Sequence, residues 1–165
     1  MANFTAETFT KHDDYMTPKS AWEDIKHLIP KDKVIWECFY GDGKSGEYLR
    51  ELGFQVIHED IDFYLENRGD IVVSNPPFSD CACACQRLKQ LDKPFILIMP
   101  SSKMNTQYFQ NIFRGDASLQ IIIPRKRIQF TKLVDGKPTK SKTSCNFDCF
   151  YYCYKIGLPN SITWI

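Results

Sequence analysis

Apolar runs alternate with more polar stretches along most of the chain. The apolar runs predict strands at residues 34–39, 54–59, 71–73, 95–99 and 119–123. The stretches between them predict helices at residues 17–29, 45–52, 81–91 and 106–113. An aromatic-rich run at residues 146–154 predicts a last strand. This order is typical of an α/β fold with a mostly parallel sheet, helices on both faces and antiparallel pairing near the C-terminal end.

Two boundaries of these elements rest on single residues. Thr17 is a suitable N-cap for the helix at residues 17–29, and Pro18 suits its first turn. Gly53 is expected to end the helix at residues 45–52. Residues 131–144 show no comparable pattern, and we expect one long loop there.

Composition limits the class of protein. The chain has 165 residues, of which 43% are hydrophobic and 25% charged, which is typical of one globular domain with a real core. No apolar run is long enough to span a bilayer, and no N-terminal signal is visible. We therefore expect an intracellular, cytoplasmic protein with no membrane partner.

The seven cysteines do not form a recognisable metal motif. They stand two apart in residues 81–85 and four apart in residues 145–153, and zinc sites usually combine two Cys-x-x-Cys pairs or one pair with histidines. An odd number also argues against a secreted disulfide scaffold. We expect buried free thiols and no metal. The histidines are isolated, and we expect surface or edge positions for them: His12, His27 and His58.

Charge is distributed unevenly along the chain. Residues 1–70 hold 15 acidic and 8 basic side chains, whereas residues 71–165 hold 5 acidic and 13 basic ones. A solvated loop and a polyanionic partner both explain the basic cluster near the C-terminal end. Phe130 lies within this cluster, and a base pulled from its neighbours could stack on it. The basic residues are Arg125, Lys126, Arg127, Lys132, Lys137, Lys140 and Lys142.

The segment "ECFYGDGKSG" places glycines between a predicted strand and a predicted helix. A phosphate-binding P-loop is excluded, because Cys38 stands where that motif needs a glycine. Gly41, Gly43 and Gly46 fit the dinucleotide-binding pattern, and Asp60 could accept ribose hydroxyls. The glycines would let the backbone approach any adenosine-type ligand. A tight turn without a ligand remains the alternative.

The segment "DIVVSNPPFS" ends a buried strand with an amide and two prolines. Prolines cannot continue a sheet ladder, so the strand stops before them. The Asn75 side-chain oxygen and the Pro76 carbonyl would be two acceptors for the two hydrogens of an exocyclic amine. Phe78, expected as an exposed ring, could stack on the base that carries this amine. An ordinary proline turn is the alternative, but it explains neither Asn75 nor Phe78.

These segments resemble the motifs of S-adenosylmethionine-dependent amino-methyltransferases, best known in adenine-N6 enzymes. "SNPPF" resembles motif IV, "DDYMTP" motif X, "WECFYGDG" motif I, and the acids of "IHEDID" the ribose-binding motif II. "PFILIMP", "RIQF" and "NFDCFYYCY" resemble the later strands. The resemblance runs from about residue 13 to residue 155. Among these enzymes, the chain most resembles the small adenine methyltransferases of phages and large viruses.

The resemblance implies a Rossmann-like class I methyltransferase fold. We expect residues 1–165 to form one catalytic domain without a separate target-recognition domain, because the chain has little room for the target-recognition region of sequence-specific DNA enzymes. The resemblance also implies S-adenosylmethionine as the cofactor. Asn75, Pro76 and Phe78 would hold the target amine, and Pro77 would fix the turn. The cofactor would lie against Tyr15, Thr17, Pro18, Glu37, Phe39, Gly41, Gly43 and Asp60.

The expected reaction is therefore methyl transfer to the N6 amine of adenine in nucleic acid, with DNA favoured over RNA. A protein glutamine amide presents the same kind of NH2 group and is an alternative substrate. A catalytically silent binding subunit is a second alternative. Target selectivity would be low, would depend on nucleic-acid shape, or would come from a homodimer or a partner subunit.

Overall fold

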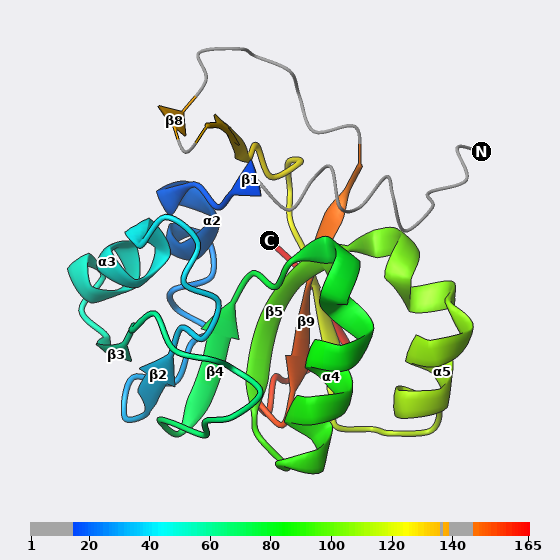
Figure 1. The fold of residues 1–165 in the computed structure, drawn as a ribbon. Helices are drawn as coiled ribbons and strands as arrows, with labels where there is room; N and C mark the ends of the chain where they lie inside the picture. Colours follow the sequence, from blue (N-terminus) through cyan, green and yellow to red (C-terminus); the bar gives the residue numbers. More distant parts are fainter. Residues whose placement is uncertain (1–14, 136, 139–146) are drawn as a thin grey trace.

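A seven-stranded sheet forms the centre of the computed structural model, which describes residues 15–135, 137–138 and 147–165 (Figure 1). The strand order is β10-β6-β9-β5-β4-β2-β3. β9 is antiparallel to both of its neighbours, and the other pairs are parallel. The strands are β2 (Val34–Trp36), β3 (Gln55–Ile57), β4 (Ile71–Ser74), β5 (Phe95–Pro100), β6 (Leu119–Ile123), β9 (Cys149–Tyr154) and β10 (Ile162–Trp164).

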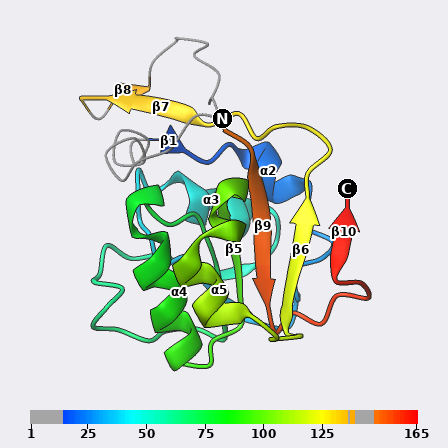
Figure 2. The same ribbon diagram turned by 90° about the vertical axis from the view of Figure 1, so that its right-hand side faces the viewer.

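Helices cover both faces of this sheet, as the sequence predicts. They are α2 (Lys19–Glu23), α3 (Lys44–Glu51), α4 (Cys81–Gln90) and α5 (Gln107–Phe113). Tyr151 of β9 donates a hydrogen bond to the Ala21 carbonyl of α2 at 2.6 Å. The next residue, Tyr152, packs edge-on against Phe109 of α5, with ring centroids 5.3 Å apart. Because successive strand residues point to opposite faces, α2 and α5 lie on opposite sides of the sheet (Figure 2).

The two central strands, β4 and β5, are buried along their whole length. Both faces of these strands are covered, which explains why their sequences are continuous apolar runs and do not alternate with polar residues. The β5 ring Phe95 stacks on Tyr154 of β9 and contacts Phe113 of α5. The core therefore joins the parallel part of the sheet to its antiparallel strand.

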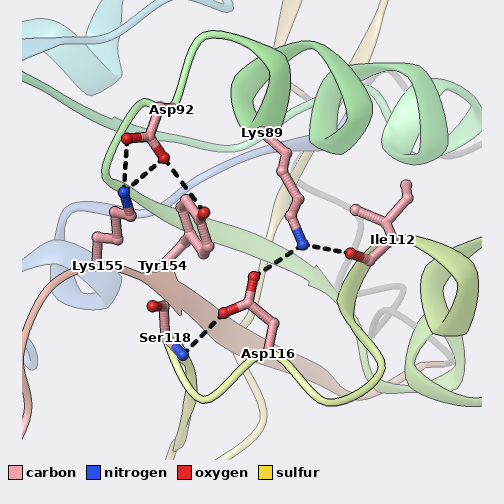
Figure 3. Close-up of polar contacts among 7 residues, drawn as sticks. All are labelled: Lys89, Asp92, Ile112, Asp116, Ser118, Tyr154 and Lys155. Carbon is pink, nitrogen blue, oxygen red and sulfur yellow. Dashed lines mark hydrogen bonds and ion pairs between the residues drawn. The ribbon is translucent and has the colours of Figure 1, made fainter.

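A polar cluster ties α4, α5 and β9 together at the edge where β5 and β6 begin (Figure 3). Lys155 forms an ion pair with Asp92, and Lys89 forms one with Asp116. Asp116 also accepts a hydrogen bond from the Ser118 amide at 3.0 Å. These contacts hold the loops at the amino edge of the parallel strands, opposite the edge at which prolines and glycines end β4 and follow β2.

A second, three-stranded sheet contains β1 (Tyr15–Met16), β7 (Thr131–Val134) and β8 (Lys137–Pro138), in the order β1-β7-β8. In Figures 1 and 2 it lies beyond the carboxyl ends of the parallel strands. The prediction of one long loop at residues 131–144 is therefore wrong for its described part. β7 pairs with β8 a few residues later and with β1 more than a hundred residues earlier, and no local pattern predicts the pairing with β1.

The helix predicted at residues 17–29 is shorter than expected. α2 ends at Glu23, and the chain continues in turns whose amides bond three residues back, as Leu28 does to Ile25. Ile25 and Ile29, four residues apart in these turns, are nevertheless both buried in the core. Thr17 is not the N-cap, because Pro18 occupies that position and no side chain caps the helix.

Three other details differ from the sequence prediction. The last aromatic strand begins at Cys149, and residue 146 lies outside the described residues. β10 was not predicted, because its three residues form a strand only through parallel pairing with β6. Within the described ranges, no helix is both long and apolar enough to cross a membrane.

Candidate functional site

Three neighbouring parallel strands deliver polar residues to one edge of the sheet. Glu37 directly follows β2, His58 directly follows β3, and Asn75 directly follows β4. Since these strands are parallel and adjacent, their carboxyl ends meet at the same edge. In α/β sheets this edge is where ligands bind. Asp60 follows His58 by two residues, so the topology brings Glu37, Asp60 and Asn75 to the same edge of the sheet.

A cavity of about 70 Å³ lies at this edge. The residues predicted to hold the amine and five of the residues predicted to bind the cofactor line this cavity. Met16, Tyr40, Asp42 and Ser45 also line it and were not predicted. The predicted residues in the lining are Tyr15, Thr17, Glu37, Phe39, Gly41, Asn75, Pro76, Pro77 and Phe78.

Three predicted cofactor residues lie outside this cavity. Pro18 caps α2, and Gly43 caps α3 with a φ of 82°, a left-handed conformation that favours glycine. Asp60 lines an adjoining hollow of about 390 Å³. Phe39 and Gly41 line both the hollow and the cavity, so the two form neighbouring parts of one edge.

Two polar atoms of the cavity lining are buried with neither a hydrogen-bond partner nor a counter-ion among the described residues. They are Oδ1 of Asn75 and Oγ1 of Thr17. An unmade hydrogen bond on a buried polar atom costs about 1–3 kcal/mol. Asn75 directly follows β4, and its neighbour Pro76 supplies a second carbonyl with no amide donor of its own. The lining therefore offers acceptors that suit a polar ligand.

Glu37 is completely buried behind this lining. Its Oε1 accepts hydrogen bonds from the Ser74 hydroxyl and from the Phe39 amide, the latter at 3.4 Å. Its Oε2 lies 2.8 Å from Nε2 of His58. Glu37 on β2 thus contacts residues at the carboxyl ends of both neighbouring strands, β3 and β4.

His58 is a buried partner of Glu37, so the prediction of a surface or edge position is wrong for this histidine. Burial lowers its pKa, but the hydrogen bond and negative charge of Glu37 outweigh burial and raise the pKa above its ordinary value. Tyr40 stacks on the ring at a centroid distance of 4.6 Å. Gly46 of α3 leaves the space that the imidazole fills, because a Cβ there would lie 2.0 Å from Nδ1.

Phe78 is buried, with 2% of its surface exposed, so the prediction of an exposed ring is wrong. Phe130 and Phe147 pack edge-on against it, at centroid distances of 5.8 and 5.2 Å. Phe130, predicted as a base-stacking residue, is itself 8% exposed. In this conformation the three rings cover one another, and a base could reach Phe78 only after they separate.

The basic residues directly after β6 lie at the same edge as Asn75, since β6 runs in the same direction as β4. Three strand spacings separate the two strands, which corresponds to about 14 Å. Arg125 and Lys126 line a hollow of about 530 Å³ together with Asp24. Arg127 instead forms an ion pair with Asp148 at 2.8 Å.

The remaining predicted basic residues have different surroundings. Lys132 of β7 pairs with Tyr15 of β1 and places its ammonium 5.9 Å from the centre of that ring. Lys137 of β8 is exposed. Lys140 and Lys142 lie outside the described residues.

The described cysteines are free thiols, and all except Cys83 are buried. Burial and the charge of Glu37 raise the pKa of Cys38 well above its usual range, so this thiol stays protonated. Among the residues that the structure describes, no three His, Cys, Asp or Glu side chains gather in an arrangement that could hold a metal ion.

The chain was also compared with known proteins. It matches no protein-family model and no curated protein. The case for a function therefore depends on the residues and geometry of the site.

Replacement of Gly46 by alanine tests the packing of His58 against α3. In an open helix position this change would stabilise the protein by about 0.5–1 kcal/mol. Here we expect it to destabilise the protein by about 1–3 kcal/mol, because the new methyl group overpacks the imidazole site. Urea unfolding measures the difference, and exposed Glu47→Ala on the same helix is the control, expected within about 0.5 kcal/mol of wild type. A stabilising Gly46→Ala change would contradict the packing.

Proposed function

We propose that the protein is an S-adenosylmethionine-dependent methyltransferase that acts on the N6 amine of adenine in nucleic acid, with DNA favoured over RNA. The observation that carries this proposal is the unpartnered Asn75 Oδ1 in the cavity lining, beside the Pro76 carbonyl. The same cavity is lined by Thr17, Glu37 and Gly41, the residues for which the motif resemblance implies cofactor binding.

The sheet supports a Rossmann-like class I methyltransferase fold. The carboxyl ends of β2, β3 and β4 form the site, and antiparallel β9 lies between β5 and β6. This is the mostly parallel sheet with an antiparallel strand near the C-terminal end that the resemblance implies. Gly41 (φ 59°) and Gly43 (φ 82°) turn the chain between β2 and α3, where a backbone can approach an adenosine-type ligand.

The chemistry follows from two acceptors held on a stiff backbone. Asn75 Oδ1 and the Pro76 carbonyl would accept the two hydrogens of the adenine amine and direct the nitrogen lone pair away from the ring plane. S-Adenosylmethionine, when bound, supplies a methyl group on a positively charged sulfur. Transfer of this methyl group to the amine nitrogen would break its bond to sulfur, and the methylated amine would then lose one proton. Positioning supplies most of the catalysis, so no strong base is required.

Thr17 and the glycine turn fit the cofactor side of the site. The Thr17 hydroxyl is buried without a partner among the described residues, so a bound ligand could satisfy it. Asp60 is exposed at the adjoining hollow and would accept the ribose hydroxyls. The aromatic and acidic lining of that hollow suits a nucleoside better than an anionic phosphate, because Asp60, Asp62 and Asp80 would repel negative charge.

Nucleic acid is favoured over a protein glutamine amide by the cations at the same edge. Arg125 and Lys126 line a hollow that follows β6 at this edge and could contact phosphates while Asn75 holds the target base. The flipped base would replace Phe130 or Phe147 against Phe78, an exchange of one aromatic contact for another.

Incubation with methyl-labelled cofactor and separate pools of DNA, RNA and protein tests the substrate class. We expect label in DNA, released as N6-methyladenine on digestion, with less label in RNA. Label on protein glutamine would support the amide substrate instead. An absence of label from all three pools, with cofactor still bound in calorimetry, would support a silent binding subunit.

Replacement of Asn75 by alanine tests the catalytic role of the amide. We expect kcat to fall by about 100-fold or more, because the missing acceptor acts mainly in the transition state. Affinity for S-adenosylhomocysteine, measured by titration calorimetry, should stay within a few-fold of wild type. Asn160→Ala, at an exposed position before β10, is the matched control and should leave both values unchanged. An active Asn75→Ala enzyme would rule out the proposed mechanism.

Replacement of Arg125 and Lys126 by glutamine tests their binding to nucleic-acid phosphates. The slope of the logarithm of the binding constant against the logarithm of the salt concentration is negative. For each phosphate that the variant no longer neutralises, we expect this slope to become shallower by about 0.9 on duplex and about 0.7 on single strands. Fluorescence anisotropy with a labelled oligonucleotide measures this slope. Glutamine at Lys31 and Lys33, exposed before β2 at the opposite edge, removes the same charge and should leave the slope unchanged. Equal slopes in both variants would exclude phosphate binding by Arg125 and Lys126.

A further inference from the structure

The ion pair between Glu37 and His58 has no role in the proposed reaction, although it lies directly behind the cavity. Glu37 is 0% exposed and His58 is 9% exposed. Burial of an isolated carboxylate is very costly, and proteins usually avoid it by pairing the charge or neutralising the group. The contacts of Glu37 therefore indicate what its burial achieves.

The two oxygens of the Glu37 carboxylate contact the protein in different ways. Oε1 accepts the Ser74 hydroxyl and the Phe39 amide, and Oε2 faces Nε2 of His58 at 2.8 Å. Oε2 has no hydrogen-bond partner among the described residues, so the ion pair with His58 is its contact with the protein. Glu37 acts as a bridge between the ends of β3 and β4, with its own strand β2 in the middle.

The surroundings of the His58 ring favour its charged form. Nε2 lies 2.8 Å from Oε2 of Glu37, and the Tyr40 ring stacks on the imidazole at a centroid distance of 4.6 Å. Burial lowers the pKa of His58, but the Glu37 carboxylate and the Tyr40 backbone outweigh burial and raise this pKa above its ordinary value. The imidazolium form is therefore the one that pairs with Glu37.

The charged and titratable groups around the pair come from each neighbouring element. Arg50 of α3 acts against the positive charge on His58, but more weakly than Glu37 favours it. Cys38, next to Glu37 in sequence, stays protonated because burial and Glu37 raise its pKa. His58 is thus the cation that balances Glu37.

A continuous set of contacts leads from this pair to the catalytic amide. His58 faces Glu37, Glu37 accepts the Ser74 hydroxyl, and Ser74 directly precedes Asn75 at the end of β4. On the other side, Tyr40 stacks on His58 and lines the cavity. Loss of the positive charge would leave Glu37 as a buried carboxylate without its counter-ion, directly beneath these residues.

Resting on the proposed function, we propose that His58 is a positioning residue of the methyltransferase site, which as an imidazolium holds Glu37, Ser74 and the Tyr40 turn in the arrangement that binds the cofactor. It acts through Glu37 and does not touch the reacting atoms. Glu37 links the ends of β3 and β4 through its contacts with His58 and Ser74, and the positive charge of His58 balances its negative charge.

The pH dependence follows from the direction of the His58 pKa shift. A raised pKa in the folded state means that the pair stabilises the fold fully below about pH 6.5, the ordinary histidine value, and loses this contribution as the pH rises through the raised pKa. Affinity for the cofactor product should weaken over the same range, because deprotonation removes the counter-ion of Glu37.

The experiment combines NMR titration of the His58 ring with calorimetry of S-adenosylhomocysteine from about pH 5.5 to 8.5. In the wild type, we expect the dissociation constant to increase with a midpoint equal to the His58 pKa. His58→Gln should raise the dissociation constant by about tenfold or more at low pH, because the buried Glu37 loses its counter-ion. The pH dependence of the dissociation constant should disappear in this variant.

The double variant His58→Gln with Glu37→Gln separates positioning from simple packing. The double variant removes both charges and keeps a side-chain amide that can bond to Ser74. We therefore expect it to bind S-adenosylhomocysteine more tightly than His58→Gln alone, with an affinity that does not depend on pH. A double variant no better than His58→Gln would overturn action through Glu37. The exposed His27, replaced by glutamine, is the control and should retain the wild-type pH profile.

The outcomes distinguish this inference from the proposed function. Tight but pH-independent binding by the wild type, or an NMR pKa for His58 that is not raised, would overturn the role of His58 and leave the methyltransferase proposal standing. A wild type that binds no S-adenosylhomocysteine at any pH would overturn both.

Discussion

The site depends on the burial of one carboxylate at the meeting point of three parallel strands. Glu37 has no exposed surface, so the protein must supply every partner that water would otherwise provide. Ser74 and His58 supply them from the two flanking strands, and Gly46 on α3 provides the space that the imidazole needs. One buried charge thus constrains three strand ends and a helix, and the cavity lining lies on these elements.

The uncharged atoms of the cavity lining differ from this carboxylate. Asn75 Oδ1 and Thr17 Oγ1 are buried without a hydrogen-bond partner among the described residues, while Glu37, a more costly group to bury, has hydrogen bonds on Oε1 and a counter-ion facing Oε2. The contrast favours a ligand as the missing partner of Asn75 and Thr17. The contrast also favours different roles for two residues of the lining: Glu37 holds the strand ends together, and Asn75 would bind the substrate.

Several features could be predicted from the sequence because they depend on neighbouring residues. The run at residues 119–123 became β6 with the same bounds, and the two prolines ended β4 just before Asn75, since proline cannot extend a ladder. Gly43 marked the start of α3 because its left-handed φ is unfavourable for other residues. The α/β order and the shared edge of Glu37 and Asn75 followed from these local signals and from the topology that parallel strands require.

The tertiary structure alone decided which side chains meet. Ser74 and Glu37 are 37 residues apart, and nothing in a lone histidine indicates that His58 would pair with Glu37. The burial of Phe78 depends on Phe130 and Phe147, and one of the two partners of β7 is the distant β1. Periodicity, proline and glycine act over a few residues, and the sequence by itself therefore determined the elements and the edge of the site. Partners across the sheet are set by packing of distant segments, so the counter-ion of Glu37 became visible only in the folded chain.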